Sequence, residues 1–308
     1  MFTSFLHEPT AICAEVEQTN PFSFQESLEQ VSFQRFQKLI QNSNLLDNLS
    51  GKTEATKQCL SFLTYIADNN ARAPSSDSHS GKSEGIADRI IAASPILESF
   101  GNAQTKRNPN SSRFGKWMVL SFDANNVITS SSIISYLLEK GRVTQRDPQE
   151  RNYHIFYQIL SGLEPSKLKE WKMSNNIKNY HYLASQGTPL NLNDEKVFFQ
   201  TKEAFVKMGF SMEDIYTIFK IVCAVLLLGN INFVATDNDE SSAIENGEVV
   251  DDIAKMLSIA PSQLRYSICF YSLESGKTRK SMIQVPLSVN KAMDSRDSLV
   301  KTSEEVDS

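Results

Sequence analysis

One short run combines several side chains that suit a nucleotide and its metal ion, and it reads Asn-Pro-Asn-Ser-Ser-Arg-Phe-Gly-Lys over residues 108–116. Asn108 and Asn110 suit tight backbone turns. The hydroxyls of Ser111 and Ser112 can ligate a hard cation or position a water, and Arg113 can pair with an anion. A cluster of Asn, Ser and Gly is also the commonest signature of a solvated loop. The run therefore indicates nucleotide binding only if a second phosphate-binding element accompanies it.

Gly51, Lys52 and Thr53 have the order of the end of a phosphate-binding loop. In such loops the backbone N–H groups and the helix N-terminus hold the phosphates, the lysine reaches the β and γ phosphates, and the hydroxyl binds Mg²⁺. The full pattern needs a glycine five positions before Gly51, where this chain has Leu46. The side chain of Leu46 and the negative charge of Asp47 oppose close approach of a phosphate. The match is therefore incomplete.

The same three-residue pattern recurs at 81–83 and at 276–278, but neither copy precedes an amphipathic helix, so both are interpreted as chance. The copy at 51–53 differs because a helix with a continuous apolar face is expected directly after it. The apolar residues of that face are Ala55, Cys59, Leu60, Phe62, Leu63 and Ile66.

These two elements occur together with further blocks in a fixed order, and the whole set resembles the myosin motor domain. Residues 51–57 resemble its phosphate loop and following helix, and residues 108–116 are similar to its switch I. The other collinear blocks lie within 95–107, 136–143, 150–158, 205–210, 226–231 and 285–297. The resemblance implies an α/β, helix-rich fold with part of a P-loop NTPase core and a helical upper subdomain.

The resemblance also implies how the chain is divided and which ligands it binds. Residues 51–308 would be a partial motor domain with flexible loops at 69–84 and 237–252, whereas 1–50 stay unassigned. The ligands would be ATP and Mg²⁺, with Thr53 and Ser112 as metal ligands. The nucleotide-binding residues would be Gly51, Lys52, Thr53, Asn108, Asn110, Ser111 and Ser112.

Two residues would take part in catalysis if the resemblance carries function. Ser111 would help to position the attacking water, and Arg113 would form the salt bridge that closes switch I onto switch II. The family's Asp-x-x-Gly-Phe-Glu string of switch II does not occur in this sequence. We therefore expect a family role as an actin-based motor ATPase, but no activity from this stretch by itself.

The expected partners are actin filaments, and we expect no light-chain binding to this stretch. The implied location is the cytoplasm, in association with the cytoskeleton. An alternative is a non-catalytic remnant that acts as a binding module. An unrelated P-loop kinase or GTPase is the third hypothesis, against which the collinear blocks argue.

Composition excludes several other classes of function. A net charge of -5 over 308 residues, with no basic stripe, argues against nucleic-acid binding. The longest apolar run, 218–234, is interrupted by Lys220, Gly229 and Asn230, so no transmembrane segment is expected. The histidines show no metal-ligand spacing, and the widely spaced cysteines indicate reduced packing thiols. The cysteines are Cys13, Cys59, Cys223 and Cys269.

The residue patterns also predict the elements that position these groups. A helix should run from Gly51 to about Asp68, and alternating apolar residues predict a strand over 116–122. Mainly helical segments should follow, including one that Ser211 and Asp214 cap at its start. A β-hairpin over 270–285 and a helix over 286–301 complete the expected order.

Overall fold

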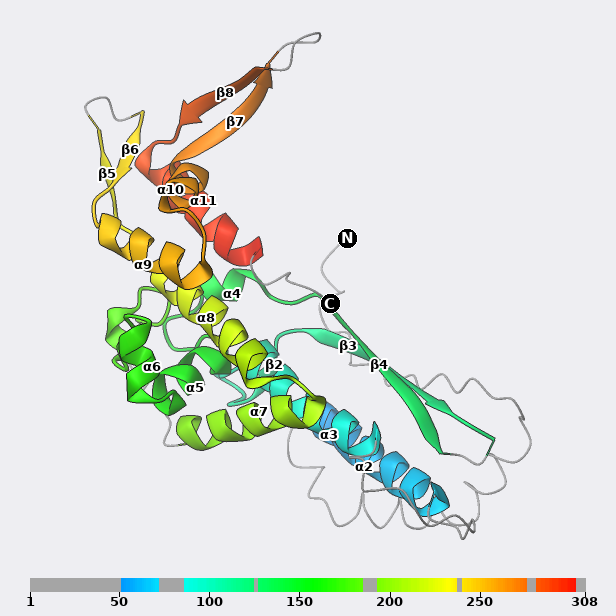
Figure 1. The fold of residues 1–308 in the computed structure, drawn as a ribbon. Helices are drawn as coiled ribbons and strands as arrows, with labels where there is room; N and C mark the ends of the chain where they lie inside the picture. The colour runs from blue at the N-terminus through cyan, green and yellow to red at the C-terminus, as the bar shows by residue number, and fades with distance from the viewer. Residues whose placement is uncertain are drawn as a thin grey trace.

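The computed structural model describes residues 51–71, 86–124, 127–184, 193–236, 240–275 and 281–302. A central body of helices carries hairpins at both ends (Figure 1). Hairpins β5–β6 and β7–β8 lie beyond one end, whereas helix α2 and hairpin β3–β4 extend from the other. The candidate loop at 104–110 lies where α3 meets the central body, because it follows α3, connects β1 to β2 and contacts His154 of α5.

The central body is built from α5 (His154–Gly162), α7 (Asp194–Met208) and α8 (Met212–Leu228). Ser211 and Asp214 form a capping box at the start of α8, as the sequence predicts. The large side chains of the main hydrophobic cluster interdigitate here, since Phe198 of α7 lies 5.2 Å from Phe219 of α8 between ring centroids. Short elements α4 (Gly141–Thr144), α6 (Pro165–Glu170) and η1 (Ile177–Asn179) connect the longer helices.

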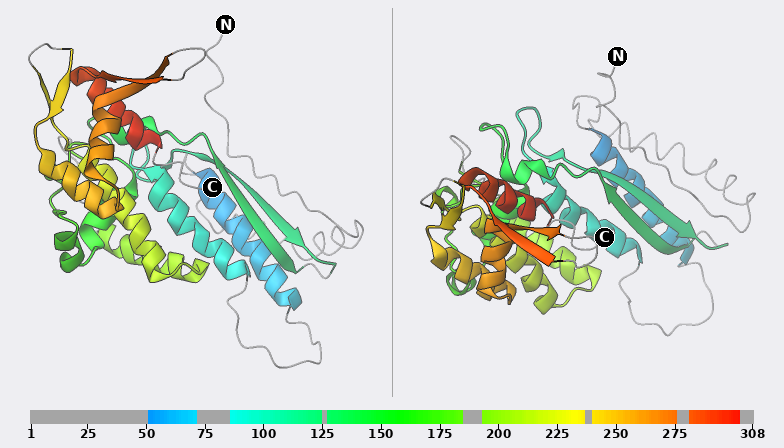
Figure 2. Two further views of the ribbon diagram at one scale, coloured as in Figure 1. Left: turned by 45° about the horizontal axis from the view of Figure 1, so that its top comes forward. Right: turned by 90° about the horizontal axis from the view of Figure 1, so that it is seen from above.

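Helices α2 (Gly51–Ala71) and α3 (Ile86–Gly101) lie side by side, with hairpin β3–β4 along them (Figure 2). They run antiparallel, because Lys57 near the start of α2 pairs with Glu98 near the end of α3. A second, smaller hydrophobic cluster holds this layer together through Leu60, Ile90 and Leu120. The predicted alternation is confirmed, since Met118, Leu120 and Phe122 share the buried face of β3.

The described strands form four two-stranded antiparallel sheets. Strand β1 (Asn102–Ala103) pairs with β2 (Ser111–Ser112), and β3 (Gly115–Phe122) pairs with β4 (Ile128–Tyr136). The other pairs are β5 (Phe233–Ala235) with β6 (Ser242–Ile244), and β7 (Phe270–Ser275) with β8 (Ser281–Pro286). The helix-rich class is thus confirmed, whereas the P-loop core stays a prediction.

The end of the molecule opposite α2 contains α9 (Gly247–Leu257), α10 (Pro261–Cys269) and α11 (Val289–Thr302). Hairpin β7–β8 and helix α11 confirm the predictions for 270–285 and 286–301. Helix α11 packs against the end of α8 through Arg296, which is 4% exposed and donates to the carbonyl of Ile231.

Two sequence-based expectations were wrong. The segment after β3 is a strand rather than a helix, because the β-branched residues of 128–136 pair with β3 along its whole length. The segment 237–252 is not a loop throughout, since it contains β6 and the first half of α9. Val250, Ile253 and Ala254 give α9 a buried stripe at helical spacing, and the acidic residues lie around it. The predicted loop at 69–84 lies outside the described residues beyond Ala71.

Candidate functional site

The candidate loop is closed at its base by the short ladder between β1 and β2, which pairs Ala103 with Ser111. Inside the loop, the backbone N–H of Thr105 donates to the carbonyl of Asn108 over 2.8 Å. The side-chain Oδ1 of Asn108 accepts from the backbone N–H of Asn110 over 2.8 Å. Such a turn is what an Asn side chain forms with the backbone two residues on. The expectation that Asn108 supports a tight turn is therefore confirmed.

The side chain of Asn110 contacts three polar side chains that fix its orientation. Its Oδ1 accepts from Asn102 Nδ2 over 3.0 Å and lies 3.1 Å from His154 Nε2. Its Nδ2 donates to Glu98 Oε2 over 3.1 Å. Since a carboxylate can only accept, the amide nitrogen must face Glu98 and the amide oxygen must face the two donors.

Glu98 also connects this loop to the helix that begins at Gly51. Its Oε1 lies 2.7 Å from Lys57 Nζ on α2. Because α2 and α3 are antiparallel, the first turns of α2 lie at the same end of the pair as the loop that follows α3. The two sequence elements that indicated phosphate binding thus approach one another, although the side chains of Lys52 and Thr53 lie outside what the structure describes.

A cavity of about 1040 Å³ lies between α2, α3, the candidate loop, α5 and the start of α7. Asn110 contributes to its lining, whereas the side chains of Lys52 and Thr53 of the predicted nucleotide-binding set lie outside the described part of the chain. Ser111 and Ser112 lie in β2, half-buried, just beyond the lined part of the loop. That these two serines bind a ligand together with Lys52 and Thr53 therefore stays a prediction. The other polar lining residues include Lys57, Glu98, Arg151, His154 and Asp194.

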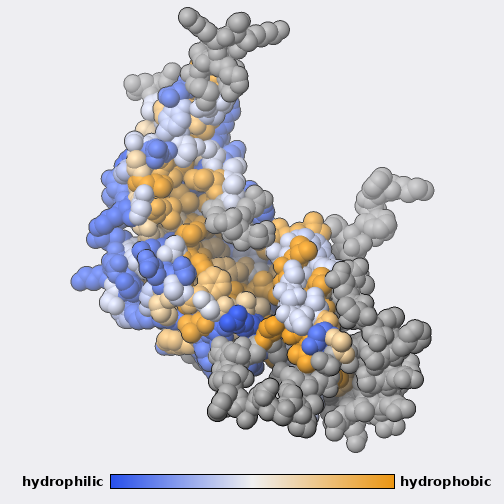
Figure 3. Space-filling view, turned by 45° about the vertical axis from the view of Figure 1, so that its right-hand side comes forward, coloured by the Kyte–Doolittle hydropathy of each residue, from blue (hydrophilic) through white to orange (hydrophobic). Residues whose placement is uncertain are grey.

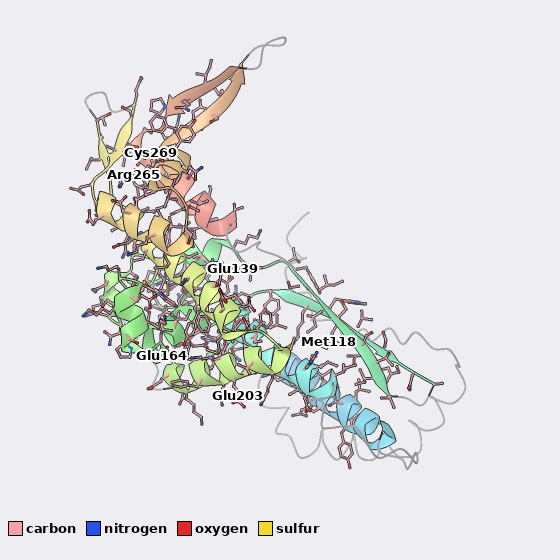
Figure 4. All side chains as sticks on the ribbon, viewed as in Figure 1. Met118, Glu139, Glu164, Glu203, Arg265 and Cys269 are labelled. Atoms are coloured by element: carbon pink, nitrogen blue, oxygen red, sulfur yellow. The ribbon has the colours of Figure 1, made fainter. Side chains whose placement is uncertain are left out.

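Arg113 has a carboxylate partner that the sequence did not indicate. Its Nε donates to Glu139 Oε2 over 2.6 Å, and its Nη1 donates to Ser111 Oγ over 3.2 Å. Glu139 lies where the chain leaves β4 and enters α4 (Figure 4), and it also accepts from Arg142 over 2.6 Å. Burial opposes the charge of Glu139, but the hydrogen bonds from Arg113 and Arg142 outweigh it and hold the pKa of Glu139 below its usual range.

His154, at the start of α5, borders both the cavity and the candidate loop. Burial, and then the positive charge of Arg151, lower the pKa of His154 to about 4. The imidazole is therefore neutral at physiological pH, and its Nε2 carries the proton that Asn110 Oδ1 accepts. The sequence predicted a helical position for His154, which is confirmed, and a structural role, which stays a prediction. It did not indicate the contact with Asn110.

The floor of the cavity contains a buried ion pair. Arg151 Nη2 lies 2.6 Å from Asp194 Oδ2, and the two side chains are 3% and 7% exposed. The guanidinium carbon of Arg151 also lies 3.9 Å from the ring centroid of Tyr157. This pair joins the loop before α5 to the first turn of α7, so it supports the wall against which the candidate loop packs.

Other classes of site find little support in the described part of the chain. Its residues contain no group of three or more His, Cys, Asp or Glu side chains that could hold a metal ion. Cys59, Cys223 and Cys269 are free thiols, as the sequence predicts for these three. None of the described helices has the length and apolar content that a membrane crossing requires. A hydroxyl-based Mg²⁺ site needs none of these groups, because Mg²⁺ prefers oxygen ligands and keeps several waters.

Comparison with known proteins agrees with the resemblance seen in the sequence. The family model of the myosin head (motor domain) matches residues 47–305. The chain is 35% identical over 254 residues to unconventional myosin IC of Drosophila melanogaster, which covers 82% of this chain and 23% of that protein. It is 39% identical over 231 residues to myosin-1 of Saccharomyces cerevisiae, which covers 74% of this chain and 12% of that protein.

A third relative, myosin IE heavy chain of Dictyostelium discoideum, is 35% identical over 259 residues, covering 82% of this chain and 25% of that protein. The chain thus spans a quarter or less of the length of these three relatives. The family match extends through the start of α2, the candidate loop and the helical body that supports them. The chain therefore belongs to the myosin head (motor domain) family.

Proposed function

We propose that this chain contributes part of the nucleotide site of an actin-based motor ATPase and that it binds Mg²⁺ and ATP. The observation that carries the proposal is the contact of Glu98 with both Lys57 and Asn110. Through it, the helix that begins at Gly51 and the loop that directly precedes the two serines meet at one end of the α2–α3 pair. A helix N-terminus favours phosphate, because its free N–H groups and its dipole attract anions.

In the proposed site, Lys52 contacts the β and γ phosphates, and the hydroxyls of Thr53 and Ser112 ligate Mg²⁺. The metal, when bound, neutralises charge on the phosphate oxygens. Ser111 helps to position the attacking water, and Asn108 and Asn110 shape the loop that presents both serines. Arg113 keeps a charged side chain beside Ser111 while Glu139 neutralises it.

A fluorescent ATP analogue, titrated into the purified chain with Mg²⁺ and with EDTA, tests nucleotide binding. We expect saturable binding that weakens at least tenfold without Mg²⁺ and in a Lys52→Ala variant, because a lysine–phosphate contact and a metal–phosphate contact are charge-assisted. Lys255→Ala, on the exposed side of α9, is the matched control and should bind like the wild type. Equal affinity of the wild type and Lys52→Ala would contradict the proposed phosphate contact.

A second candidate function is an interaction module that binds actin filaments without hydrolysis. It is favoured by the exposed apolar side chains of hairpin β7–β8, where Tyr271, Leu273 and Ile283 are 41%, 47% and 48% exposed. Co-sedimentation with filaments, with and without ATP, separates the two. Binding that ATP does not change favours the module, whereas binding that ATP releases favours the motor component.

A further inference from the structure

We propose that Lys57, Glu98 and Asn110 form a chain of positioning residues that sets where the 104–113 loop lies relative to the start of α2. This inference rests on the proposed nucleotide binding for its effect on affinity, but its effect on the loop can be measured without any nucleotide. We call these three residues the Glu98 relay. None of them needs to touch a reacting atom.

Glu98 is the centre of the relay because its two oxygens face two different elements. Oε1 lies 2.7 Å from Lys57 Nζ on α2, and Oε2 accepts from Asn110 Nδ2 in the loop over 3.1 Å. A carboxylate held from two sides has little freedom to rotate. Any displacement of α2 relative to α3 is therefore transmitted to Asn110, which directly precedes Ser111 and Ser112.

Asn110 can act as a rigid end of the relay because the remaining contacts of its side chain are on other elements. Asn102 donates to it from β1, and His154 faces it from the start of α5. Its backbone N–H is also held by Asn108. Loss of the bond to Glu98 would leave the loop held at its base by β1–β2 but no longer tied to α2.

The surroundings of Glu98 make it sensitive to charge. Its side chain is 22% exposed and that of Lys57 is 32% exposed, so solvent screens the pair only in part. Lys116 of β3 is also close, since its ammonium interacts with the charges of Glu98 and Lys57. Two lysines around one carboxylate leave an excess positive charge beside the cavity, which attracts a polyanion such as a nucleotide triphosphate.

The relay makes a specific prediction about coupling. Glu98→Gln keeps a side-chain oxygen for Asn110 but removes the charge that Lys57 needs, and Lys57→Met removes the same ion pair from the other side. If both act through one relay, the double variant should be no worse than either single variant. Lys57→Arg keeps the charge and should recover most of the wild-type behaviour.

Hydrogen exchange of the nucleotide-free chain gives the first measurement. We expect the amides of Asn108 and of residues 110–113 to exchange at least threefold faster in Glu98→Gln and Lys57→Met than in the wild type. Lys202→Met is the matched control, because it breaks the Lys202–Glu164 pair of 3.0 Å. That pair lies well away from β3, as the labels of Glu164 and Met118 indicate (Figure 4). The amides of the loop in Lys202→Met should exchange at the same rate as in the wild type.

Affinity for the fluorescent ATP analogue gives the second measurement, with the midpoint of thermal unfolding recorded for every variant. We expect Glu98→Gln and Lys57→Met to bind roughly tenfold more weakly, the size expected for a lost charge-assisted contact that positions a ligand loop. Lys202→Met should bind like the wild type even if it unfolds at a lower temperature.

The outcomes separate the relay from the proposed function. Unchanged loop exchange in both Glu98→Gln and Lys57→Met overturns the relay, whatever the nucleotide does. Additive effects in the double variant overturn it as well. If the wild type binds no nucleotide but loop exchange is still faster in Glu98→Gln and Lys57→Met, the relay is supported as a device that positions the loop. Only the proposed function is then refuted.

Discussion

The buried pair between Arg151 and Asp194 offers the strongest single test of the fold around the cavity. Asp194→Asn removes the negative charge and leaves the guanidinium of Arg151 inside the protein, where its side chain is 3% exposed. Removing one partner of a buried ion pair costs about 3–5 kcal/mol, since the remaining charge has lost its compensation. The contact with the Tyr157 ring persists, so we expect a loss of about 3 kcal/mol in the free energy of unfolding.

Urea unfolding followed by tryptophan fluorescence suits this test, because Trp171 is 4% exposed and its emission will shift on unfolding. Asp251→Asn is the matched control, since its pair with Arg265 has the same 2.6 Å distance but Asp251 is 58% exposed. Exposed pairs contribute less than about 1 kcal/mol. The double variant Arg151→Met/Asp194→Leu removes both charges and should be more stable than Asp194→Asn.

The comparison between the two asparagine variants decides the outcome. If Asp194→Asn costs no more than Asp251→Asn, the pair is solvated and the wall of the cavity is not built as described. If the double variant is as unstable as Asp194→Asn, the loss comes from α7 itself rather than from an uncompensated charge. Either result would refute the reasoning from burial.

Two further predictions concern a close contact and a pH dependence. Gly229→Ala should lower the free energy of unfolding by about 1–3 kcal/mol, because the added Cβ would lie 2.6 Å from the Tyr182 ring. Gly141→Ala is the control and should leave stability unchanged, because nothing lies within 4 Å of its added Cβ. Thermal unfolding of both variants checks this prediction. His154 has a pKa lowered to about 4 from 6.5, so the unfolded chain takes up its proton first and stability should fall by roughly 2–3 kcal/mol between pH 6.5 and 4. Urea midpoints across that interval should be flatter in His154→Gln, and an identical slope in both proteins would refute the assignment.

Sequence patterns predicted the elements whose own residues specify them. The capping box of Ser211 and Asp214 lies within four residues, and the alternation of β3 is carried by consecutive side chains. Both signals are local, so no knowledge of the remaining fold is needed. The same holds for the Asn108 turn, in which a side chain bonds the backbone two residues on.

Elements that depend on distant partners were missed. Strand β4 is rich in serine and exposed along most of its length, so its pairing with β3 rather than its own periodicity specifies it. Helix α9 begins inside an acidic segment, and its apolar stripe is recognisable only once α8 supplies the surface that it covers.

The candidate site shows the same division. The types of Ser111, Ser112 and Arg113 could be interpreted from sequence, but Glu139 lies 26 residues from Arg113, and His154 lies 44 residues from Asn110. No spacing rule joins residues so far apart. Glu98 is similarly connected to both α2 and the loop only through the folded arrangement.

Hairpin β3–β4 has a consequence for how the protein behaves in solution. Among the residues that the structure describes, these two strands form a ladder only with each other, and the edge of such a two-stranded sheet is where a further strand can add. Ile134, Tyr136 and Leu137, in β4 or directly after it, are 56%, 42% and 85% exposed. Figure 3 shows apolar side chains gathered in a hollow of the face that it presents. Such an edge recruits any free strand, including that of a second molecule. Dilution, rather than added salt, should therefore keep this chain monomeric, because salt strengthens apolar association.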